Sequence, residues 1–190
     1  MSADEYALLA GVAKGDAVCF ERLYPLYERR VFQYLMTLVH ETGLAEELVV
    51  DTMLAVWNGA QRFNKGSRIS TWIFGIARHK ALDALRHAGR DRRSGRHVAL
   101  DEAAEVPSQA CGPEELTHQL SLQGVLGSAF RDLSAEHREI LHLAFFEDLA
   151  YEEIASLLGL PVNTVKTRVY YAKQKLKAGI DRHTLVESAP

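Results

Sequence analysis

The residues best suited to chemistry lie near the carboxyl end, in the stretch VNTVKTRVYYAKQKLK that follows Pro161. Between 162 and 177 it carries five lysines or arginines and no acid. On a helix, four apolar residues of this stretch share one face: Val165, Val169, Ala172 and Leu176. Other faces carry basic, amide, hydroxyl and aromatic side chains: Asn163, Lys166, Thr167, Tyr170, Tyr171, Gln174 and Lys177. Such a surface can enter the major groove of DNA, with Arg168 or Lys173 holding phosphates.

The residues before this helix have the spacing of a helix-turn-helix. Ile154 and Leu158 are apolar, and Ala155 is small where two helices would cross closely. Gly159 lies where the chain must turn sharply before Pro161. For the charge alone, a basic amphipathic helix without a role in DNA binding is the alternative.

A second basic segment lies in the first half of the chain. Residues 61–96 include ten lysines or arginines and two aspartates, although the 190-residue chain has a formal net charge of −3. Two basic segments in an otherwise acidic chain indicate two contacts with a polyanion. For either segment taken alone, a solvated helix face is an equally good explanation.

The hydrophobic pattern predicts helices that position both segments. Asp16 is a predicted N-cap for a long helix toward His40, and a second helix is expected from about 44 to 61. The polar loop RFNKGSRIS follows, and helical spacing resumes at TWIFGIARHKALDALRHAGR. Ser134 is a predicted N-cap further along the chain.

Helical spacing fails between about 88 and 112, where a basic run precedes an acidic, proline-bearing one. We therefore predict an all-α protein with two helical modules, at 1–88 and 114–190, joined by a flexible linker at 89–113. The second module contains the helix-turn-helix.

Several classes of protein are disfavoured by composition. No uninterrupted apolar run approaches the roughly 18 residues of a membrane span, and the acidic start has no basic leader, which favours a cytoplasmic protein. Cys19 and Cys111 do not form a metal or disulfide pattern, and we interpret both as buried thiols. We find no phosphate loop and no nucleophile with a positioned base, so neither an enzyme nor a cofactor or metal site is expected.

The segment from DAVCFERLYPLYERR to HKALDALR, followed by a linker and LSAEHREILHLAFFEDLAYEEIASLLGLPVNTVKTRVYYAKQKL, resembles a bacterial RNA polymerase sigma factor of the extracytoplasmic-function (ECF) group, in the sigma-70 family. The resemblance covers nearly the whole chain, with sigma region 2 preceding sigma region 4. It implies that the first module binds core RNA polymerase and opens the minus-10 promoter element. The second module would read the minus-35 element.

The resemblance also implies roles for particular residues. Core polymerase would bind an acidic and apolar surface: Glu47, Asp51, Leu54 and Trp57. The minus-10 element would be met by a loop and a helix: Arg62, Asn64, Lys65, Arg78, His79, Lys80, Asp83 and Arg86. The minus-35 element would be met by the helix after Pro161: Asn163, Thr164, Lys166, Thr167, Arg168, Tyr170, Tyr171 and Lys173. Many relatives carry a basic residue in place of Tyr171, so the upstream sequence preference is left open.

Alternatives remain for these residues and for the whole chain. Leu54 and Trp57 can instead be core residues, His79 and Asp83 can be solvated helix residues, and we interpret Trp72 as core. The expected partners are core RNA polymerase, promoter DNA and an anti-sigma factor, without a small-molecule substrate. One alternative function is a stand-alone helix-turn-helix regulator that binds DNA without polymerase. Another is a sigma-like adaptor that sequesters a regulator.

Overall fold

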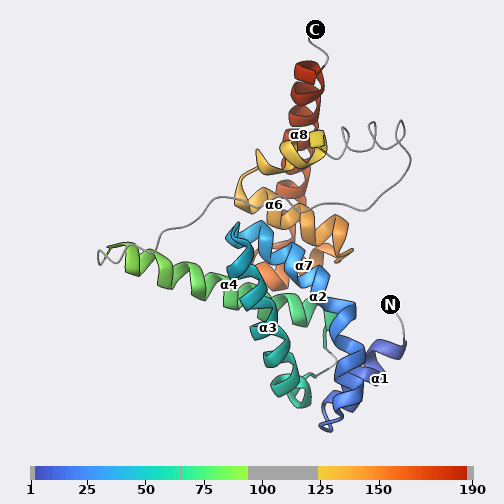
Figure 1. The fold of residues 1–190 in the computed structure, drawn as a ribbon. Helices are drawn as coiled ribbons and strands as arrows, with labels where there is room; N and C mark the ends of the chain where they lie inside the picture. The colour runs from blue at the N-terminus through green and yellow to red at the C-terminus, as the bar shows by residue number, and fades with distance from the viewer. Residues whose placement is uncertain (1–2, 65, 94–123, 188–190) are drawn as a thin grey trace, which may run out of the picture. The chain divides into compact units, whose positions relative to one another are not determined.

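The structure is a computed structural model that describes residues 3–64, 66–93 and 124–187 (Figure 1). All regular secondary structure in these residues is helical, which confirms the all-α prediction. The chain divides into two compact units, at residues 1–103 and 104–190. The predicted linker lies largely outside the described residues, as do Lys65 and Cys111.

Unit 1 is built around one long helix that contacts the other three. Its elements are α1 (Ala3–Val12), α2 (Ala17–Val39), α3 (Thr42–Gly59), the short 3-10 helix η1 (Ala60–Arg62) and α4 (Ile69–Arg93). Helix α2 packs against α1, α3 and α4. The core consists of large apolar and aromatic side chains from all four helices, among them Leu9, Leu23, Tyr27, Tyr34, Leu35, Met53, Val56, Ile73 and Phe74.

Local capping explains where α2 and α3 begin. The Asp16 carboxylate accepts hydrogen bonds from the backbone N–H groups of Val18 (2.9 Å) and Cys19 (3.3 Å), so the predicted N-cap is confirmed. His40 ends α2 in the left-handed conformation, with φ of 56°. The Glu41 carboxylate then caps α3, which therefore begins at Thr42, slightly before the predicted start near 44.

Helix α4 is longer than the sequence pattern indicates. It ends at Arg93, beyond the predicted module boundary at residue 88. The segment GRDRR contains no proline, and its charged side chains do not need a buried face, so helix can continue where the apolar period has stopped. The amphipathic spacing therefore stops several residues before the helix ends.

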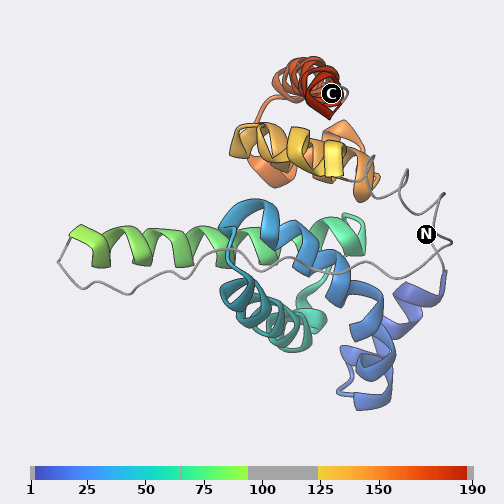
Figure 2. The same ribbon diagram turned by 45° about the horizontal axis from the view of Figure 1, so that its top comes forward.

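Unit 2 places a helix-turn-helix after three shorter helical segments (Figure 2). Residues 124–131 are helical. They are followed by α6 (Ala135–Leu141), a π-helical turn η2 (His142–Phe146), α7 (Tyr151–Leu158) and α8 (Val162–Glu187), the red helix in Figures 1 and 2. Both α6 and α7 pack against α8. Their shared core includes Ile140, Leu141, Leu143, Ile154, Val165, Val169 and Ala172.

The turn between α7 and α8 has the predicted chemistry. Gly159 adopts the left-handed conformation with φ of 68°, and the Leu160 N–H donates to the Ala155 carbonyl at 2.9 Å. At the start of α7, the Glu153 carboxylate accepts from the Ala150 N–H at 3.0 Å. Ser134 does occupy the N-cap position of α6, but its hydroxyl lies 2.9 Å from His137 Nδ1 and makes no capping bond to the backbone.

No helix in the described ranges is both long and apolar enough to span a membrane.

Candidate nucleic-acid interface

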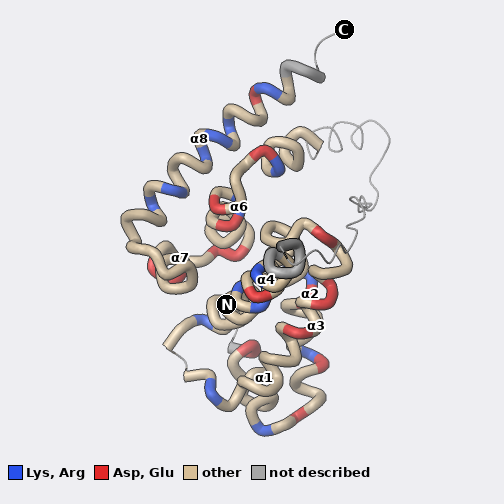
Figure 3. Tube along the Cα trace, turned by 90° about the vertical axis from the view of Figure 1, so that its left-hand side faces the viewer, with Lys and Arg blue, Asp and Glu red and all other residues tan. Residues whose placement is uncertain are grey.

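Helix α8 separates apolar and polar side chains as the sequence predicts. Val165, Val169 and Ala172 are buried against the rest of unit 2, and Leu176 is half-buried. Most of the predicted groove-facing residues are exposed: Asn163, Lys166, Thr167, Tyr170, Tyr171 and Lys173. Figure 3 shows the basic positions recurring along this helix, with acid only near its carboxyl end. The exposed part of α8 is therefore a positively charged ridge.

Two predicted residues of α8 are held within unit 2. Arg168 is half-buried, and its Nη1 lies 3.2 Å from Glu136 Oε2 on α6. Thr164 is half-buried in the first turn, where its N–H donates to the Pro161 carbonyl. Because α6 and α8 are distant in sequence, no local pattern reveals the Arg168–Glu136 pair.

Tyr170 and Tyr171 form an exposed aromatic pair. Their side chains are 59% and 57% exposed, and their ring centroids lie 5.5 Å apart with an interplanar angle of 75°. This edge-to-face geometry is one that aromatic pairs prefer. Each ring therefore limits the orientations of the other without being buried.

The loop before α4 presents two of the predicted minus-10 residues to solvent. Arg62 is exposed at the end of η1. Asn64 is also exposed, and its Oδ1 accepts a hydrogen bond from the Gly66 N–H at 3.1 Å. This hydrogen bond uses the Asn64 carbonyl oxygen and leaves the amide nitrogen to donate elsewhere.

Three predicted residues of α4 meet in one exposed cluster. His79 Nδ1 lies 3.0 Å from Asp83 Oδ2, and the Arg86 guanidinium is bonded to the other oxygen of Asp83. The i, i+4 and i, i+3 spacings place these side chains on one stripe. Arg78 is half-buried and lies on a different face of the helix.

The outer face of α3 carries exposed apolar side chains. Val50 and Leu54 are 59% and 55% exposed, whereas Val49 and Val56 on the opposite side are buried, so Leu54 is not part of the core. Glu47 beside them is exposed. Trp57 is half-buried and packs edge-on against Phe20 of α2, with ring centroids 5.2 Å apart. We call the surface formed by Glu47, Val50, Asp51, Leu54 and Trp57 the α3 surface.

Asp51 links the α3 surface to α4. Its Oδ2 lies 3.1 Å from Lys80 Nζ, with the two side chains 50% and 30% exposed. The pair joins a residue predicted to bind polymerase to one predicted to bind DNA. Sequence reasoning missed the contact because it depends on the packing of α3 against α4.

A groove of about 450 Å³ lies beside the α3 surface, between α2 and α3. Tyr24, Glu28 and Phe32 of α2 line it together with Glu46 and Val50 of α3. Arg29 lines it as well, so the groove continues the α3 surface with apolar, acidic and basic side chains.

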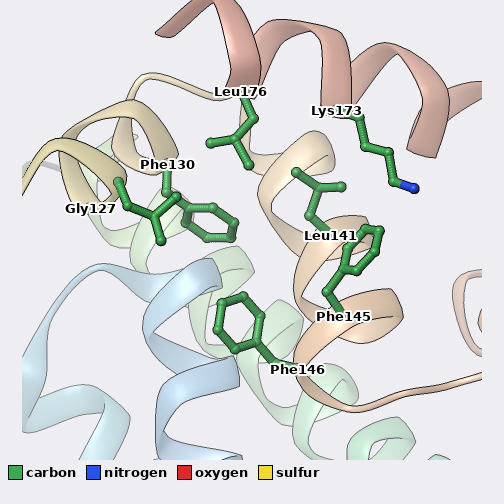
Figure 4. Close-up of a pocket in the computed structure, with 8 residues that line it drawn as sticks. Gly127, Phe130, Leu141, Phe145, Phe146, Lys173 and Leu176 are labelled. Carbon is green, nitrogen blue, oxygen red and sulfur yellow. The ribbon is translucent and has the colours of Figure 1, made fainter. Parts of the chain in front are cut away.

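A larger and more apolar pocket lies within unit 2 (Figure 4). It has a volume of about 560 Å³ and is lined by residues of four elements: Leu126, Gly127 and Phe130 from the 124–131 helix, Leu141 from α6, Phe145 and Phe146 from η2, and Lys173 and Leu176 from α8. Phe145 and Phe146 are more than half exposed, and the Lys173 ammonium lies 4.6 Å from the Phe145 ring centroid. The sequence analysis did not predict this pocket. The adjacent residues Phe145 and Phe146 are the feature of the sequence that could have indicated it.

Cys19 takes part in a structural contact at the start of α2. Hydrogen bonding of the Cys19 thiol to Asp16 at 3.2 Å, together with burial, raises the pKa of Cys19. This cysteine is half-buried at the N-terminus of α2, so the expectation of a fully buried thiol was wrong. Trp72 is likewise half-buried, against Phe63. Within residues 3–64, 66–93 and 124–187, no group of three or more His, Cys, Asp or Glu is placed to hold a metal ion.

Two sequence families match the two helical units. The family described as Sigma-70 region 2 matches residues 23–91, and the family described as Sigma-70, region 4 matches residues 124–176. The first match ends within α4, and the second spans the 124–131 helix, α6, α7 and the first half of α8.

Characterised relatives cover most of the chain. The ECF RNA polymerase sigma factor RpoE of Cereibacter sphaeroides is 31% identical over 85% of this chain and 86% of its own length. The ECF RNA polymerase sigma factor SigW of Bacillus subtilis is 25% identical over 87% of this chain and 91% of its own. Among solved structures, the sigma factor RpoE from Bartonella quintana, crystallised with the anti-sigma factor NepR, is similar with a TM-score of 0.70 and 25% identity, over 85% of this chain and 96% of that one.

The region 2 and region 4 families thus coincide with the unit that carries the α3 surface and with the unit that carries the basic helix α8, in the order that the sequence predicts. The chain belongs to the extracytoplasmic-function group of the sigma-70 family of RNA polymerase sigma factors.

Proposed function

We propose that this chain acts in the cytoplasm as a sigma factor without enzymatic activity of its own. It binds core RNA polymerase through the α3 surface, reads the minus-35 element as duplex through α8, and opens the minus-10 element with α4 and the preceding loop. The observation that carries the proposal is the exposed basic ridge of α8, placed by a helix-turn-helix within a member of this family.

The α8 ridge supports reading of a duplex. Lys166, Thr167 and Tyr170 are exposed while the opposite face is buried, so the helix can enter a major groove without losing its packing. Lysine and hydroxyl groups can contact base edges and phosphates. Arg168 would have to leave Glu136 to hold a phosphate, or would position α8 through that pair.

The α4 residues support contact with a partly opened strand. Opening a duplex costs stacking energy, which a protein offsets by capturing an extruded base and by neutralising the released backbone. Exposed Asn64 offers its amide to a base edge, and Arg62 lies close by in the chain. Lys80 and Arg86 provide positive charge once their carboxylate partners are displaced.

The α3 surface supports docking of a protein partner. Exposed Val50 and Leu54 flanked by Glu47 and Asp51 fit a partner that offers apolar side chains with basic residues around them. We assign such a surface, apolar with basic residues around it, to core polymerase.

We also propose control by an anti-sigma factor. The Bartonella quintana sigma factor with a similar fold was crystallised with one. The α3 surface and the apolar pocket of unit 2 offer such a partner exposed leucine, valine and phenylalanine side chains. A partner bound to the α3 surface would compete with core polymerase.

Binding of the fluorescently labelled chain to bacterial core RNA polymerase, followed by anisotropy, tests the proposal. We expect tight 1:1 binding that Leu54→Glu weakens by about 30-fold or more, since a central apolar contact contributes roughly 2 kcal/mol. Leu26→Glu is the matched control, because Leu26 is an exposed leucine of α2 on the side away from Tyr24 and Glu28.

Equal weakening by both substitutions would reject the α3 surface as the polymerase contact. Absence of core binding, with duplex DNA held by the chain alone, would support the stand-alone regulator instead.

A further inference from the structure

Two exposed tyrosines stand in the middle of the surface that α8 offers to DNA. Tyr170 and Tyr171 are not needed for the core of unit 2, because the buried face of α8 is formed by Val165, Val169 and Ala172. More than half of each side chain is exposed, and the rings are held edge to face at 5.5 Å. The two rings therefore contribute little to the stability of unit 2 and are available to contact a partner.

The same surface offers no arginine for base reading. Arg168 is the one arginine between 162 and 177, and it is half-buried beside Glu136. The commonest specific contact to DNA is a bidentate guanidinium on the O6 and N7 atoms of guanine. This helix therefore has to obtain much of its sequence preference from lysine, amide, hydroxyl and aromatic groups.

Helical spacing divides these groups into two columns. Tyr170 lies one turn beyond Lys166, and Tyr171 lies one turn beyond Thr167. The first column carries a charge. The second carries a methyl group and an aromatic ring, both of which can make apolar contacts with the 5-methyl group of thymine in the major groove.

We propose that Tyr171, together with the methyl group of Thr167, selects minus-35 elements through the 5-methyl group of a thymine, and that Tyr170 positions the Tyr171 ring. The inference rests on the proposed reading of the minus-35 element by α8. It assigns a specificity-determining contact to an apolar group of the base, where a basic side chain would instead favour guanine or phosphate.

Holoenzyme assembled from core polymerase and the full chain provides the test. Duplexes that bind the holoenzyme are selected from a pool of promoters with a fixed minus-10 element and a randomised minus-35 region. Each thymine of the selected element, on either strand, is then replaced by deoxyuridine, which lacks the 5-methyl group and keeps the same hydrogen-bonding groups. We expect one such replacement to weaken binding by about threefold to fivefold, the effect of removing one buried methyl group.

Variants separate the ring from its hydroxyl and from general affinity. Tyr171→Ala should bind the thymine and deoxyuridine promoters equally, whereas Tyr171→Phe should retain the difference. Tyr170→Ala should reduce the difference and Tyr170→Phe should keep it, because only the ring packs against Tyr171. Lys177→Ala is the control, since loss of an exposed charge should weaken both promoters alike. Both tyrosine side chains are exposed, so core binding and helix content should be unchanged.

Selection of an element without thymine, or binding that is indifferent to deoxyuridine at every position, would overturn the inference. Failure of the proposed minus-35 function looks different: randomising the whole element would then leave holoenzyme binding unchanged.

Discussion

The two basic segments differ in how their positive charge is compensated within the protein. On α4, Lys80 is paired with Asp51, and Arg86 and His79 share Asp83. On α8, the sequence contains no acid from 162 to 180, and Arg168 reaches its partner only on another helix. The α8 ridge thus keeps a positive field in the free protein, whereas His79, Lys80 and Arg86 of α4 already have carboxylate partners.

This difference has consequences for the order of binding. DNA phosphates can pair directly with the exposed lysines of α8. At α4 they would have to displace carboxylates that are already paired with Lys80 and Arg86. The proposed binding of α4 residues to DNA would therefore be strengthened by any event that removes Asp51 or Asp83 from its partner. Because Asp51 lies on the α3 surface, docking of polymerase there, as proposed above, would be one such event.

The largest expected effect is reversal of charge on α8. Lys166→Glu removes a predicted base or phosphate contact and adds repulsion, so holoenzyme affinity for its promoter should fall by about 30-fold to 100-fold. Filter binding at constant salt measures this. Lys14→Glu, an equal change of charge at an exposed position outside both basic segments, should have little effect. Similar losses in both variants would mean that only net charge matters.

A smaller effect is expected when the carboxylate that compensates α4 is removed. Asp51→Asn should strengthen binding of the free chain to single-stranded DNA by about threefold to tenfold and make its salt dependence steeper by about one ion, since Lys80 becomes available.

The Asp51→Asn effect should disappear when Lys80 is replaced by alanine as well, because the two changes act through one contact. An unchanged gain in the double variant would show that Lys80 is not the group that Asp51 restrains. The same substitution should weaken core binding, which is measured separately by anisotropy.

The smallest effect is expected at Arg168, which is paired with Glu136 in the free protein. Glu136→Gln should change holoenzyme affinity by about threefold or less, because a partly exposed ion pair contributes roughly 0–1 kcal/mol. Increased affinity would mean that Arg168 is freed to hold a phosphate, and decreased affinity would mean that the pair positions α8. Arg168→Ala distinguishes a direct phosphate contact from positioning, since only the former reduces the salt slope.

Sequence reasoning succeeded where the physical cause is local. The Asp16 cap, the left-handed Gly159 and the buried stripe that includes Val165 follow from neighbouring residues and helical spacing, and the structure confirms all three. The exposure of Lys166 and Tyr170 follows from the same periodicity.

The contacts that sequence reasoning missed depend on tertiary packing. Asp51 and Lys80 lie on different helices, as do Glu136 and Arg168, so neither pair has a signature in the order of residues. The apolar pocket was missed for a related reason. A π-helical turn at His142–Phe146 changes the helical period, and exposed Phe145 and Phe146 then contribute to a pocket shared with the 124–131 helix and α8.

Promoter-directed transcription is the most direct measurement of the central claim. Core polymerase is supplied with the purified chain and a promoter selected by the holoenzyme, and the start site and yield of run-off transcripts are recorded. The account predicts specific initiation that requires the chain and is lost when either the minus-10 or the minus-35 element is scrambled. Initiation that is indifferent to the chain, or a chain that holds the duplex equally well without polymerase and yields no transcript, would contradict it.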